Sequence, residues 1–436
     1  MNPNKDYFLI EGLSGARKLR GNIAVNGSKN AVLPMMAGAL LFDNFVKIGN
    51  CPDIEDIKRM SEILAGLSVN VSSLERTQIV IDPSRLSDTK LNIDLSKRLR
   101  ASIFLVGPLL ARQGEASFPH PGGCVIGERP IDLFLDGFAK MGAVVSETDD
   151  MYVLRVQGKV LKGAELVFKF QSVGATETFL MAAVLADGVT VLRNCAMEPE
   201  VEDLAQFLVK SGAKIAGIGT PTLTIEGRAG KLLRAGDEAY QAIPDRIEAG
   251  SFLILGAMAA SELKITNCLP EHLSVPIETL RQIGAKIETN ADSITVRAVP
   301  EGVCQNISAK THEYPGFPTD LQAPLTVLMT QCCAEGMVFE TIYEGRLNYT
   351  TDLIRMGADI KLWDAHHITV KGPTPLKGKE LEGPDIRAGI AFIIAAIVAE
   401  GQSTIRNAYY VDRGYADIEK RLSEIGANIK RVRSEN

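Results

Sequence analysis

The feature that most constrains this chain of 436 residues is a sequence unit that occurs six times. In each copy an amphipathic helical stretch ends at a glycine and continues as a β run, and the copies follow one another at intervals of about 70 residues. The six glycines are Gly66, Gly142, Gly212, Gly284, Gly357 and Gly426. Because glycine takes the left-handed backbone conformation without strain, each of them is predicted to end its helix.

Each unit reads as a strand, an apolar helix, a second strand, an amphipathic helix and two further strands, which predicts an α/β fold. The sixth unit lacks its last strand, and residues 7–12 match the missing pattern, so the first strand is predicted to complete the last unit. Units of this length favour closed domains over a superhelix. We therefore expect two domains of three units, one of residues 29–243 and the other of residues 1–28 and 244–436.

The net charge and the apolar runs exclude several classes of protein. With a net charge of −6 the chain is not expected to bind nucleic acid, because neutralising phosphates needs a basic face. The longest apolar runs, 31–42 and 388–399, fall well below the roughly 20 residues of a membrane helix, so no membrane partner is expected. The first residues carry no export signal, and the seven cysteines do not suggest a disulfide framework. These features predict a cytoplasmic protein with free thiols.

Polar and charged residues recur at the start of the apolar helix of each unit. The residues at this place are Lys29, Asn30, Arg100, Ser172 with the following Val173 and Gly174, Asp245, Asp320, Asp385 and Arg387. A carboxylate at a helix start has the ordinary explanation of capping, which leaves Asp245 and Asp385 open between a structural and a functional role. A cation at that place opposes the helix dipole unless an anion intervenes, so Lys29 and Arg100 are predicted to bind an anionic ligand.

A second recurring place is the loop after the middle strand of the unit, which contains Arg129, Arg346 and Arg413. A single surface arginine is usually solvated, but recurrence at one place in several units favours a shared site. If three units close around one axis, their equivalent loops meet on one face. The sequence therefore predicts an anion site lined by Lys29, Arg100, Arg129, Arg346, Arg387 and Arg413. Such a site suits a phosphate with a carboxylate, or a diphosphate.

The cysteines differ in their surroundings. Cys51, Cys195 and Cys268 occupy equivalent places and are interpreted as small, half-buried fillers. Cys124 lies among three glycines, five residues before Arg129, in a loop that is predicted to be exposed and able to move. A thiol in an electropositive loop is reactive, so Cys124 is predicted to be catalytic. The chain has no P-loop, dinucleotide or zinc motif, and no metal or organic cofactor is expected.

Four separated segments resemble the UDP-N-acetylglucosamine 1-carboxyvinyltransferase family of enolpyruvyl transferases: residues 26–31, 121–133, 317–322 and 412–415. The resemblance covers essentially the whole chain, in order. It implies an α/β fold of two pseudo-threefold inverse barrels built from six βαβαββ repeats. It also implies the first committed step of peptidoglycan synthesis, in which enolpyruvate passes from phosphoenolpyruvate to the 3′-hydroxyl of UDP-N-acetylglucosamine through a tetrahedral ketal and phosphate is released.

The resemblance also implies a role for each matching residue. Lys29, Arg129 and Arg413 would hold phosphoenolpyruvate, with Arg346 and Arg387 nearby. The sugar nucleotide would be held by Asn30, Arg100, Arg129, Pro130, Ile131, Asp132, Leu133, Ser172, Val173, Gly174 and the backbone of Ile342. Asp320 would accept the proton of the attacking hydroxyl. Cys124 would protonate the methylene carbon, and it would be the residue that fosfomycin alkylates.

Two positions depart from the family pattern. Phe170 lies where many members have a lysine two residues before the serine, and Phe134 lies where a histidine is frequent, so the resemblance implies no sugar-nucleotide contact at these two positions. A shikimate-3-phosphate enolpyruvyl transferase is an alternative with the same architecture, but it lacks the cysteine loop. A non-catalytic anion-binding scaffold is a second alternative, which would have no need for Cys124 together with Asp320.

Overall fold

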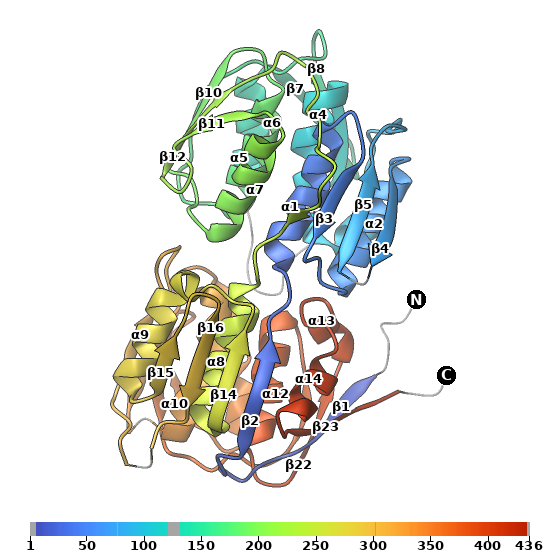
Figure 1. Cartoon of the computed structure of the whole chain (residues 1–436). Coiled ribbons are helices and arrows are strands. Elements are labelled where there is room, and N and C mark those ends of the chain that lie inside the picture. Colours follow the sequence, from blue (N-terminus) through green and yellow to red (C-terminus); the bar gives the residue numbers. More distant parts are fainter. Residues whose placement is uncertain (1–5, 76, 121–130, 301, 333, 434–436) are drawn as a thin grey trace. The chain divides into compact units, whose positions relative to one another are not determined.

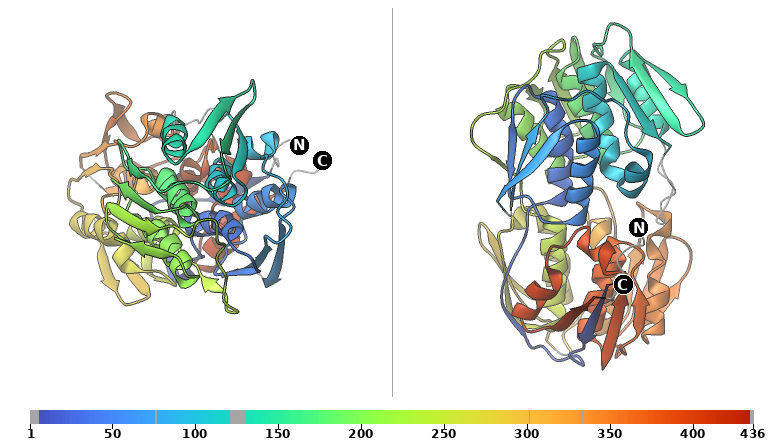
Figure 2. Two further views of the ribbon diagram at one scale, coloured as in Figure 1. Left: turned by 90° about the horizontal axis from the view of Figure 1, so that it is seen from above. Right: turned by 90° about the vertical axis from the view of Figure 1, so that its right-hand side faces the viewer.

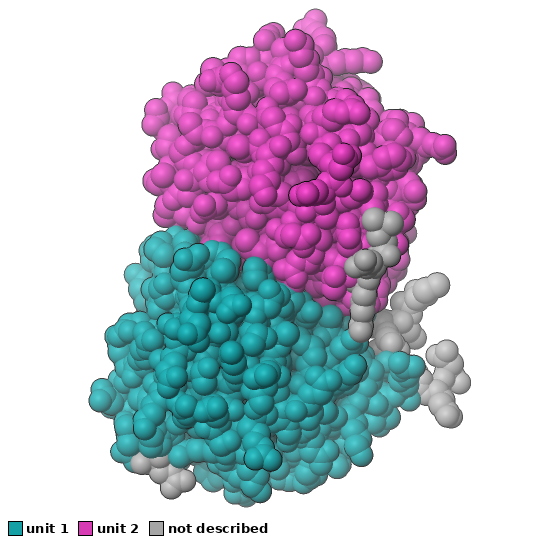
Figure 3. Space-filling model, in the orientation of Figure 1, with its two compact units in different colours: residues 1–26, 124–127, 244–436 teal, residues 27–123, 128–243 magenta. Residues whose placement is uncertain are grey.

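The computed structural model describes residues 6–75, 77–120, 131–300, 302–332 and 334–433 (Figure 1). These residues divide into two compact units, with the undescribed residues left aside (Figure 3). Unit 1 is formed by residues 1–26 and 244–436, and unit 2 by residues 27–123 and 128–243. The division follows Asn26 and Ile243, whereas the sequence analysis drew its first boundary after Ser28.

Unit 1 alternates helices with short strands. Its strands are β1 (Tyr7–Glu11), β2 (Leu19–Ala24), β14 (Ala260–Thr266), β15 (Lys286–Thr289), β16 (Ser293–Arg297), β17 (Ser308–Lys310), β18 (Gly336–Phe339), β19 (Asp359–Leu362), β20 (His367–Lys371), β21 (Glu380–Glu382), β22 (Gln402–Arg406) and β23 (Asn428–Val432). Its helices are α8 (Arg246–Ala259), α9 (Ser274–Ile283), α10 (Gln322–Cys332), α11 (Thr350–Arg355), α12 (Ile386–Val398), α13 (Ala408–Asp412) and α14 (Ile418–Glu424). The 3₁₀ turns are η3 (Pro270–Leu273), η4 (Thr319–Leu321) and η5 (Glu344–Leu347).

Unit 2 is built in the same way. Its strands are β3 (Val46–Gly49), β4 (Asn70–Glu75), β5 (Gln78–Asp82), β6 (Glu115–Pro119), β7 (Ala143–Glu147), β8 (Met151–Val156), β9 (Glu165–Val167), β10 (Val189–Arg193), β11 (Lys214–Ala216), β12 (Thr222–Glu226) and β13 (Tyr240–Gln241). Its helices are α1 (Lys29–Gly38), α2 (Glu55–Gly66), α3 (Ile93–Arg98), α4 (Val106–Gln113), α5 (Asp132–Lys140), α6 (Val173–Val184) and α7 (Pro199–Lys210), with 3₁₀ turns η1 (Ala39–Leu41) and η2 (Arg100–Leu105).

The four-stranded sheets share one arrangement, in which an edge strand runs parallel to its neighbour and two antiparallel strands follow. The orders are β21-β22-β1-β23, β2-β14-β16-β15 and β17-β18-β20-β19 in unit 1, and β13-β3-β5-β4 and β9-β10-β12-β11 in unit 2. The three-stranded sheet β6-β8-β7 has a parallel bridge from Lys90 to Ser117 at the corresponding edge. Strand β1 pairs with β22 on one side and β23 on the other, so the N-terminal strand lies in the sheet formed by the end of the chain.

Each unit has helices on its inside and sheets around them (Figure 1; Figure 2). Helices α8, α10 and α12 pack on one another, and every residue of α8 and α12 is buried. Their sequences are apolar on all sides, which is the pattern of a helix surrounded by protein. The strands alternate buried and half-exposed residues, as strand β12 does, because one face of each sheet covers these helices.

The glycine signals that end the helices hold in five units and fail in the first. Gly142, Gly212, Gly284, Gly357 and Gly426 have φ angles of +92°, +96°, +112°, +107° and +102°. Gly66 is instead the last residue of α2, and the left-handed residue is Ser68, with φ +66°. The helix runs further than the sequence predicted because Ser68 takes the strained conformation, and its hydroxyl lies 2.9 Å from that of Ser87.

These environments give opposite expectations for two glycine-to-alanine changes in helices of unit 2. A Cβ on Gly107 of α4 would lie 2.4 Å from the carbonyl oxygen of Thr178 in α6, so G107A should separate the two helices and cost about 1–3 kcal/mol. A Cβ on Gly66 meets no atom within 4 Å, so G66A should stabilise α2 by about 0.5–1 kcal/mol. Thermal unfolding of both variants tests this, and shifts of the same sign would contradict it.

The buried carboxylate of Asp203 in unit 2 fixes residues 240–243, after which the chain continues into unit 1. Asp203 of α7 accepts hydrogen bonds from the Tyr240 hydroxyl at 2.8 Å and from the backbone N–H of Ile243 at 3.0 Å. Burial raises the pKa of Asp203 from 3.8 to about 6, although both hydrogen bonds act in the opposite direction. The folded protein therefore binds a proton at this residue where the unfolded chain has released it.

The stability of the protein should accordingly depend on pH through Asp203. The stabilisation is complete below about pH 4 and is lost as the pH rises through about 6, since the raised pKa favours the protonated folded state. In D203N this slope should disappear, while the exposed D149N should keep it. Unfolding free energies measured between pH 4 and 8 test this expectation. A wild-type slope that persists in D203N would assign the pH dependence to other groups.

Candidate active site

Three of the predicted site residues form an ionic cluster inside unit 1. Asp320 lies in η4 and accepts hydrogen bonds from Arg346 of η5 through Oδ1 and from Arg387 of α12 through Oδ2, the latter at 3.0 Å. Both arginines are more than nine-tenths buried, while a quarter of the Asp320 side chain is exposed. The carboxylate is thus the exposed member of a cluster whose cations are fixed.

The Arg387 guanidinium is held on its other side by hydroxyl groups. Its Nη1 donates to the Tyr415 hydroxyl at 3.3 Å, and that oxygen lies 3.1 Å from the Ser251 hydroxyl. Burial alone would lower the pKa of Arg387, but the charge of Asp320 and the other nearby oxygens outweighs it, and the net direction is upward. Burial also raises the pKa of Tyr415 to about 12. Arg387 is therefore a permanent, oriented cation beside a neutral phenol.

Arg413 lies in a segment that is fixed from two directions. Its neighbour Asp412 accepts two hydrogen bonds from Arg431, at 2.9 and 2.5 Å, and Tyr415 contacts Arg387. Arg431 also donates to Glu419 at 2.8 Å. The sequence analysis predicted Arg413 but missed Arg431, because its position in the final strand β23 carries no motif.

Lys29 begins α1 in unit 2, and its ammonium group lies 3.2 Å from the carboxylate of Asp56 in the first turn of α2. The sequence analysis expected an anionic ligand to explain a cation at this helix start. The chain itself supplies one anion through Asp56, which is nearly fully buried. Sequence reasoning missed Asp56, since acidic residues in the first turn of a helix are ordinary dipole partners. Asn30 is half-buried beside Lys29, and Arg100 is exposed at the start of η2.

Apart from Asn30 and Arg100, the described sugar-nucleotide residues predicted in unit 2 lie at the starts of two helices that pack on each other, α5 and α6. Ile131 precedes α5, and Asp132 and Leu133 are its first residues. Ser172 caps α6 by accepting a hydrogen bond from the N–H of Ala175 at 3.3 Å, with Val173 and Gly174 following. Phe134 stacks on Phe179, with 6.2 Å between ring centroids, so this departure from the family pattern packs into the α5–α6 contact. Cys124, Arg129 and Pro130 lie outside the described residues.

Two carboxylates that the sequence left open are helix caps. Asp245 accepts hydrogen bonds from the N–H groups of Ile247 and Glu248 at the start of α8. Asp385 does the same for Arg387 and Ala388 at the start of α12. The capping of α12 also fixes the backbone of Arg387, so Asp385 supports the ionic cluster without belonging to it.

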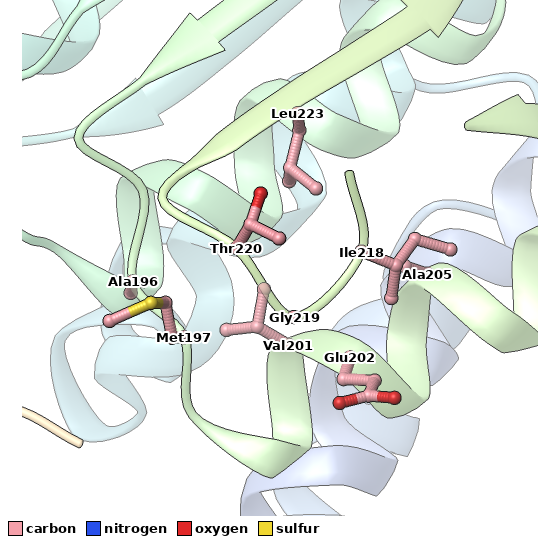
Figure 4. A pocket seen from close by; sticks show the side chains of 9 residues that line it. All are labelled: Ala196, Met197, Val201, Glu202, Ala205, Ile218, Gly219, Thr220 and Leu223. Atoms are coloured by element: carbon pink, nitrogen blue, oxygen red, sulfur yellow. The ribbon is translucent and has the colours of Figure 1, made fainter. Parts of the chain in front are cut away.

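Two of the pockets among the described residues are lined by residues other than Asp320, Arg346 and Arg387. One lies in unit 2 and is lined by Ala196, Met197, Val201, Glu202, Ala205, Ile218, Gly219, Thr220 and Leu223 (Figure 4). Its lining carries a carboxylate and no cation, which does not suit an anionic substrate. Within the described part of the chain, no group of three or more histidine, cysteine, aspartate or glutamate side chains is arranged to hold a metal ion. Among the helices described, none is long and apolar enough to cross a membrane.

Comparisons with known proteins decide the family. The chain is 44% identical over 432 residues to a UDP-N-acetylglucosamine 1-carboxyvinyltransferase of Koribacter versatilis, covering 98% of this chain and 96% of the relative. It is 42% identical over 422 residues to that of Campylobacter hominis, covering 96% and 98%. Residues 13–422 match the family model described as EPSP synthase (3-phosphoshikimate 1-carboxyvinyltransferase). The chain belongs to the UDP-N-acetylglucosamine 1-carboxyvinyltransferase family. The family predicted from four motifs is thereby confirmed.

Solved structures confirm the enolpyruvyl transferase fold. The enolpyruvyl transferase NikO from Streptomyces tendae matches with a TM-score of 0.86 at 24% identity, covering 99% of this chain and all of that one. An EPSP synthase from Acinetobacter baumannii matches with a TM-score of 0.72 at 17% identity, covering 98% of this chain. The α/β fold class predicted from the sequence agrees with the fold of these two structures.

The buried cysteines of this family member should be chemically inert. Cys51, Cys195 and Cys268 are at most 3% exposed. Burial raises the pKa of the Cys51 thiol to about 12 and those of Cys195 and Cys268 to about 11. Since the thiolate is the reactive form, iodoacetamide at pH 8 should leave all three unmodified in the folded protein and modify them after unfolding. Peptide mass mapping tests this, and rapid native labelling of any of the three would contradict it.

Proposed function

We propose that this protein transfers enolpyruvate from phosphoenolpyruvate to the 3′-hydroxyl of UDP-N-acetylglucosamine and releases phosphate. The observation that carries the proposal is the identity of 40–44% to relatives of that name over almost the whole chain. The Asp320 cluster supports it, because such a reaction needs a carboxylate beside fixed cations. By this proposal the chain serves the first committed step of peptidoglycan synthesis.

The reaction is an addition followed by an elimination. The 3′-oxygen attacks C2 of phosphoenolpyruvate and its proton passes to Asp320, while the methylene carbon receives a proton from Cys124. The resulting tetrahedral ketal then loses a proton from the new methyl group and expels phosphate, which restores the double bond. No redox change occurs, and no metal or organic cofactor takes part in the proposed steps.

We assign the two substrates to different groups of residues. We assign phosphoenolpyruvate to Lys29, Arg129 and Arg413, with Arg346 and Arg387 nearby. The sugar nucleotide is assigned to Asn30, Arg100, Arg129, Pro130, Ile131, Asp132, Leu133, Ser172, Val173, Gly174 and the backbone of Ile342. The starts of α5 and α6 suit a diphosphate, since unpaired N–H groups and the helix dipole favour anions there.

The pairing of Asp320 with two arginines gives a reason why Asp320 would accept a proton only after substrate has bound. While both guanidinium groups donate to the carboxylate, neither oxygen is free of a cation. An incoming phosphate or carboxylate competes for those N–H groups, because arginine binds either anion in the same forked geometry. Anion binding would therefore release a carboxylate oxygen to accept the hydroxyl proton.

The remaining parts of the proposal follow from the family. Each unit is proposed to be a pseudo-threefold inverse α/β barrel of three βαβαββ repeats, with domains of residues 29–243 and of residues 1–28 and 244–436. The repeated sheet order supports this arrangement. The protein is proposed to act in the cytoplasm on two small-molecule substrates, and fosfomycin is proposed to alkylate Cys124.

A second candidate is transfer to shikimate 3-phosphate. The description of the matching family model names this reaction, and one similar solved structure is an EPSP synthase. Three relatives at 42–44% identity are named for the sugar-nucleotide reaction, which favours the first candidate.

Phosphate release with two acceptors tests the proposal. With phosphoenolpyruvate and UDP-N-acetylglucosamine the protein should release phosphate, and shikimate 3-phosphate should give none. Preincubation with fosfomycin should abolish release, and peptide mapping should find the adduct on Cys124. D320N should lower kcat by at least about 100-fold because it removes the proton acceptor. The exposed D364N serves as its control and should retain full activity.

The outcomes separate the candidates. Release only with shikimate 3-phosphate would overturn the choice of acceptor, and silence with both acceptors from folded protein would favour a non-catalytic scaffold. An adduct on another cysteine would overturn the assignment of Cys124.

A further inference from the structure

We propose that Glu340 is a positioning residue that fixes the Asp320 base and the sugar-nucleotide contact at Ile342 relative to each other. Glu340 follows strand β18 and is fully buried, yet nothing in the sequence motifs of the chain points to it. The inference rests on the proposed function, because it concerns the same site and the same reaction.

The carboxylate of Glu340 joins two segments that carry site residues. Its Oε2 accepts a hydrogen bond from the Thr319 hydroxyl at 2.8 Å, and Thr319 directly precedes Asp320 in η4. Its Oε1 accepts from the backbone N–H groups of Ile342 at 2.8 Å and Tyr343 at 3.2 Å. A single side chain therefore sets the spacing between the turn that carries the base and the loop that carries Ile342.

Glu340 is itself held firmly at the sheet edge. Its N–H donates to the His366 carbonyl at 2.8 Å, and its carbonyl oxygen lies 2.8 Å from Nδ1 of His366. The next residue, Thr341, donates two hydrogen bonds to Thr311, from its N–H to the hydroxyl oxygen at 2.8 Å and from its own hydroxyl to the carbonyl oxygen at 2.6 Å. The Glu340 carboxylate is thus anchored by a β-sheet and hydrogen-bonded to two loops, so it can hold these loops at a fixed position relative to the sheet.

A hydrogen-bond relay links Glu340 to the base. Nε of Arg346 donates to the Thr319 oxygen at 3.3 Å, while Nη2 of the same arginine donates to Asp320. Since a hydroxyl has one proton, donation to Glu340 leaves the lone pairs of Thr319 for Arg346. Glu340 thereby orients the Thr319 hydroxyl. That hydroxyl in turn orients Arg346, which holds Asp320. It also places a buried negative charge near the Arg346 guanidinium, which is 7% exposed.

The substitution E340Q changes this relay without changing its size. An amide keeps one acceptor for the two N–H groups but presents N–H donors to Thr319, so the hydroxyl must reverse and loses its acceptor. Hydrogen bonds to charged groups are worth about 1.5–3 kcal/mol, so kcat/KM for UDP-N-acetylglucosamine should fall about 10- to 100-fold. KM for phosphoenolpyruvate should stay within about twofold, since Lys29 and Arg413, which are assigned to it, are not part of the relay through Thr319 and Arg346.

The partner residue gives an independent readout. T319S retains the hydroxyl and should keep nearly full activity, whereas T319V keeps the shape and should reproduce the loss in E340Q. If Glu340 acts through Thr319, the double variant E340Q/T319V should be no slower than either single variant. E335Q, at the exposed residue directly before the same strand, is the matched control and should behave as wild type.

The kinetic experiment distinguishes this inference from the function itself. Wild-type protein that releases no phosphate with UDP-N-acetylglucosamine would overturn the proposed function. Active wild type together with E340Q and T319V that match it would overturn the positioning role. Losses in E340Q and T319V that multiply in the double variant would overturn the relay. If E340Q unfolds, the comparison of T319V with T319S decides, because Thr319 is half-exposed and its variants keep the buried carboxylate.

Discussion

The architecture depends on the complete burial of its inner helices. Helices α8 and α12 have no exposed residue, and α10 is buried along most of its length, so these helices have no outer face on which a polar group could meet solvent. The charged residues of these helices are therefore confined to their first turns and to the turns that precede them. Asp385, Arg387 and Asp320 all occupy such positions. The same constraint explains why the sequence repeats its charged residues at one place in the unit, since only that place is open to them.

Within that constraint, the residues that cap a helix lie next to residues of the site. Asp385 satisfies the first N–H groups of α12, and the next side chain but one, Arg387, reaches Asp320 and Tyr415. The cap holds the helix start in place, and the helix start fixes the cation. Arg431 has a comparable effect on Asp412 and so on the backbone of Arg413. The site thus inherits its rigidity from helix ends and sheet edges.

The sequence predicted what depends on local physical chemistry and missed what depends on contacts through space. Five glycines marked helix ends because a left-handed residue is a local requirement, but at the first unit Ser68 meets that requirement two residues after Gly66. The recurring places in the unit and the resemblance to the family pointed to Asp320, Arg346 and Arg387 as residues of one site, and the structure brings them into contact. Asp56 and Glu340 could not be found in this way, because each acts on a residue more than twenty positions away. A buried carboxylate has no sequence signature until its partners are known.

Charge balance ties these observations to the order of events in the site. Leaving a buried arginine without its partner costs about 3–5 kcal/mol, because the guanidinium has already lost its water. Arg346 and Arg387 are both buried, so Asp320 cannot leave them for a substrate hydroxyl unless another anion takes its place. In the proposed reaction, the substrate that accepts the enolpyruvyl group would offer a hydroxyl to Asp320, and phosphoenolpyruvate would offer the replacing anion. Under that proposal, proton acceptance and anion binding are coupled by electrostatics, and Asp320 becomes available as a base only when phosphoenolpyruvate is also bound.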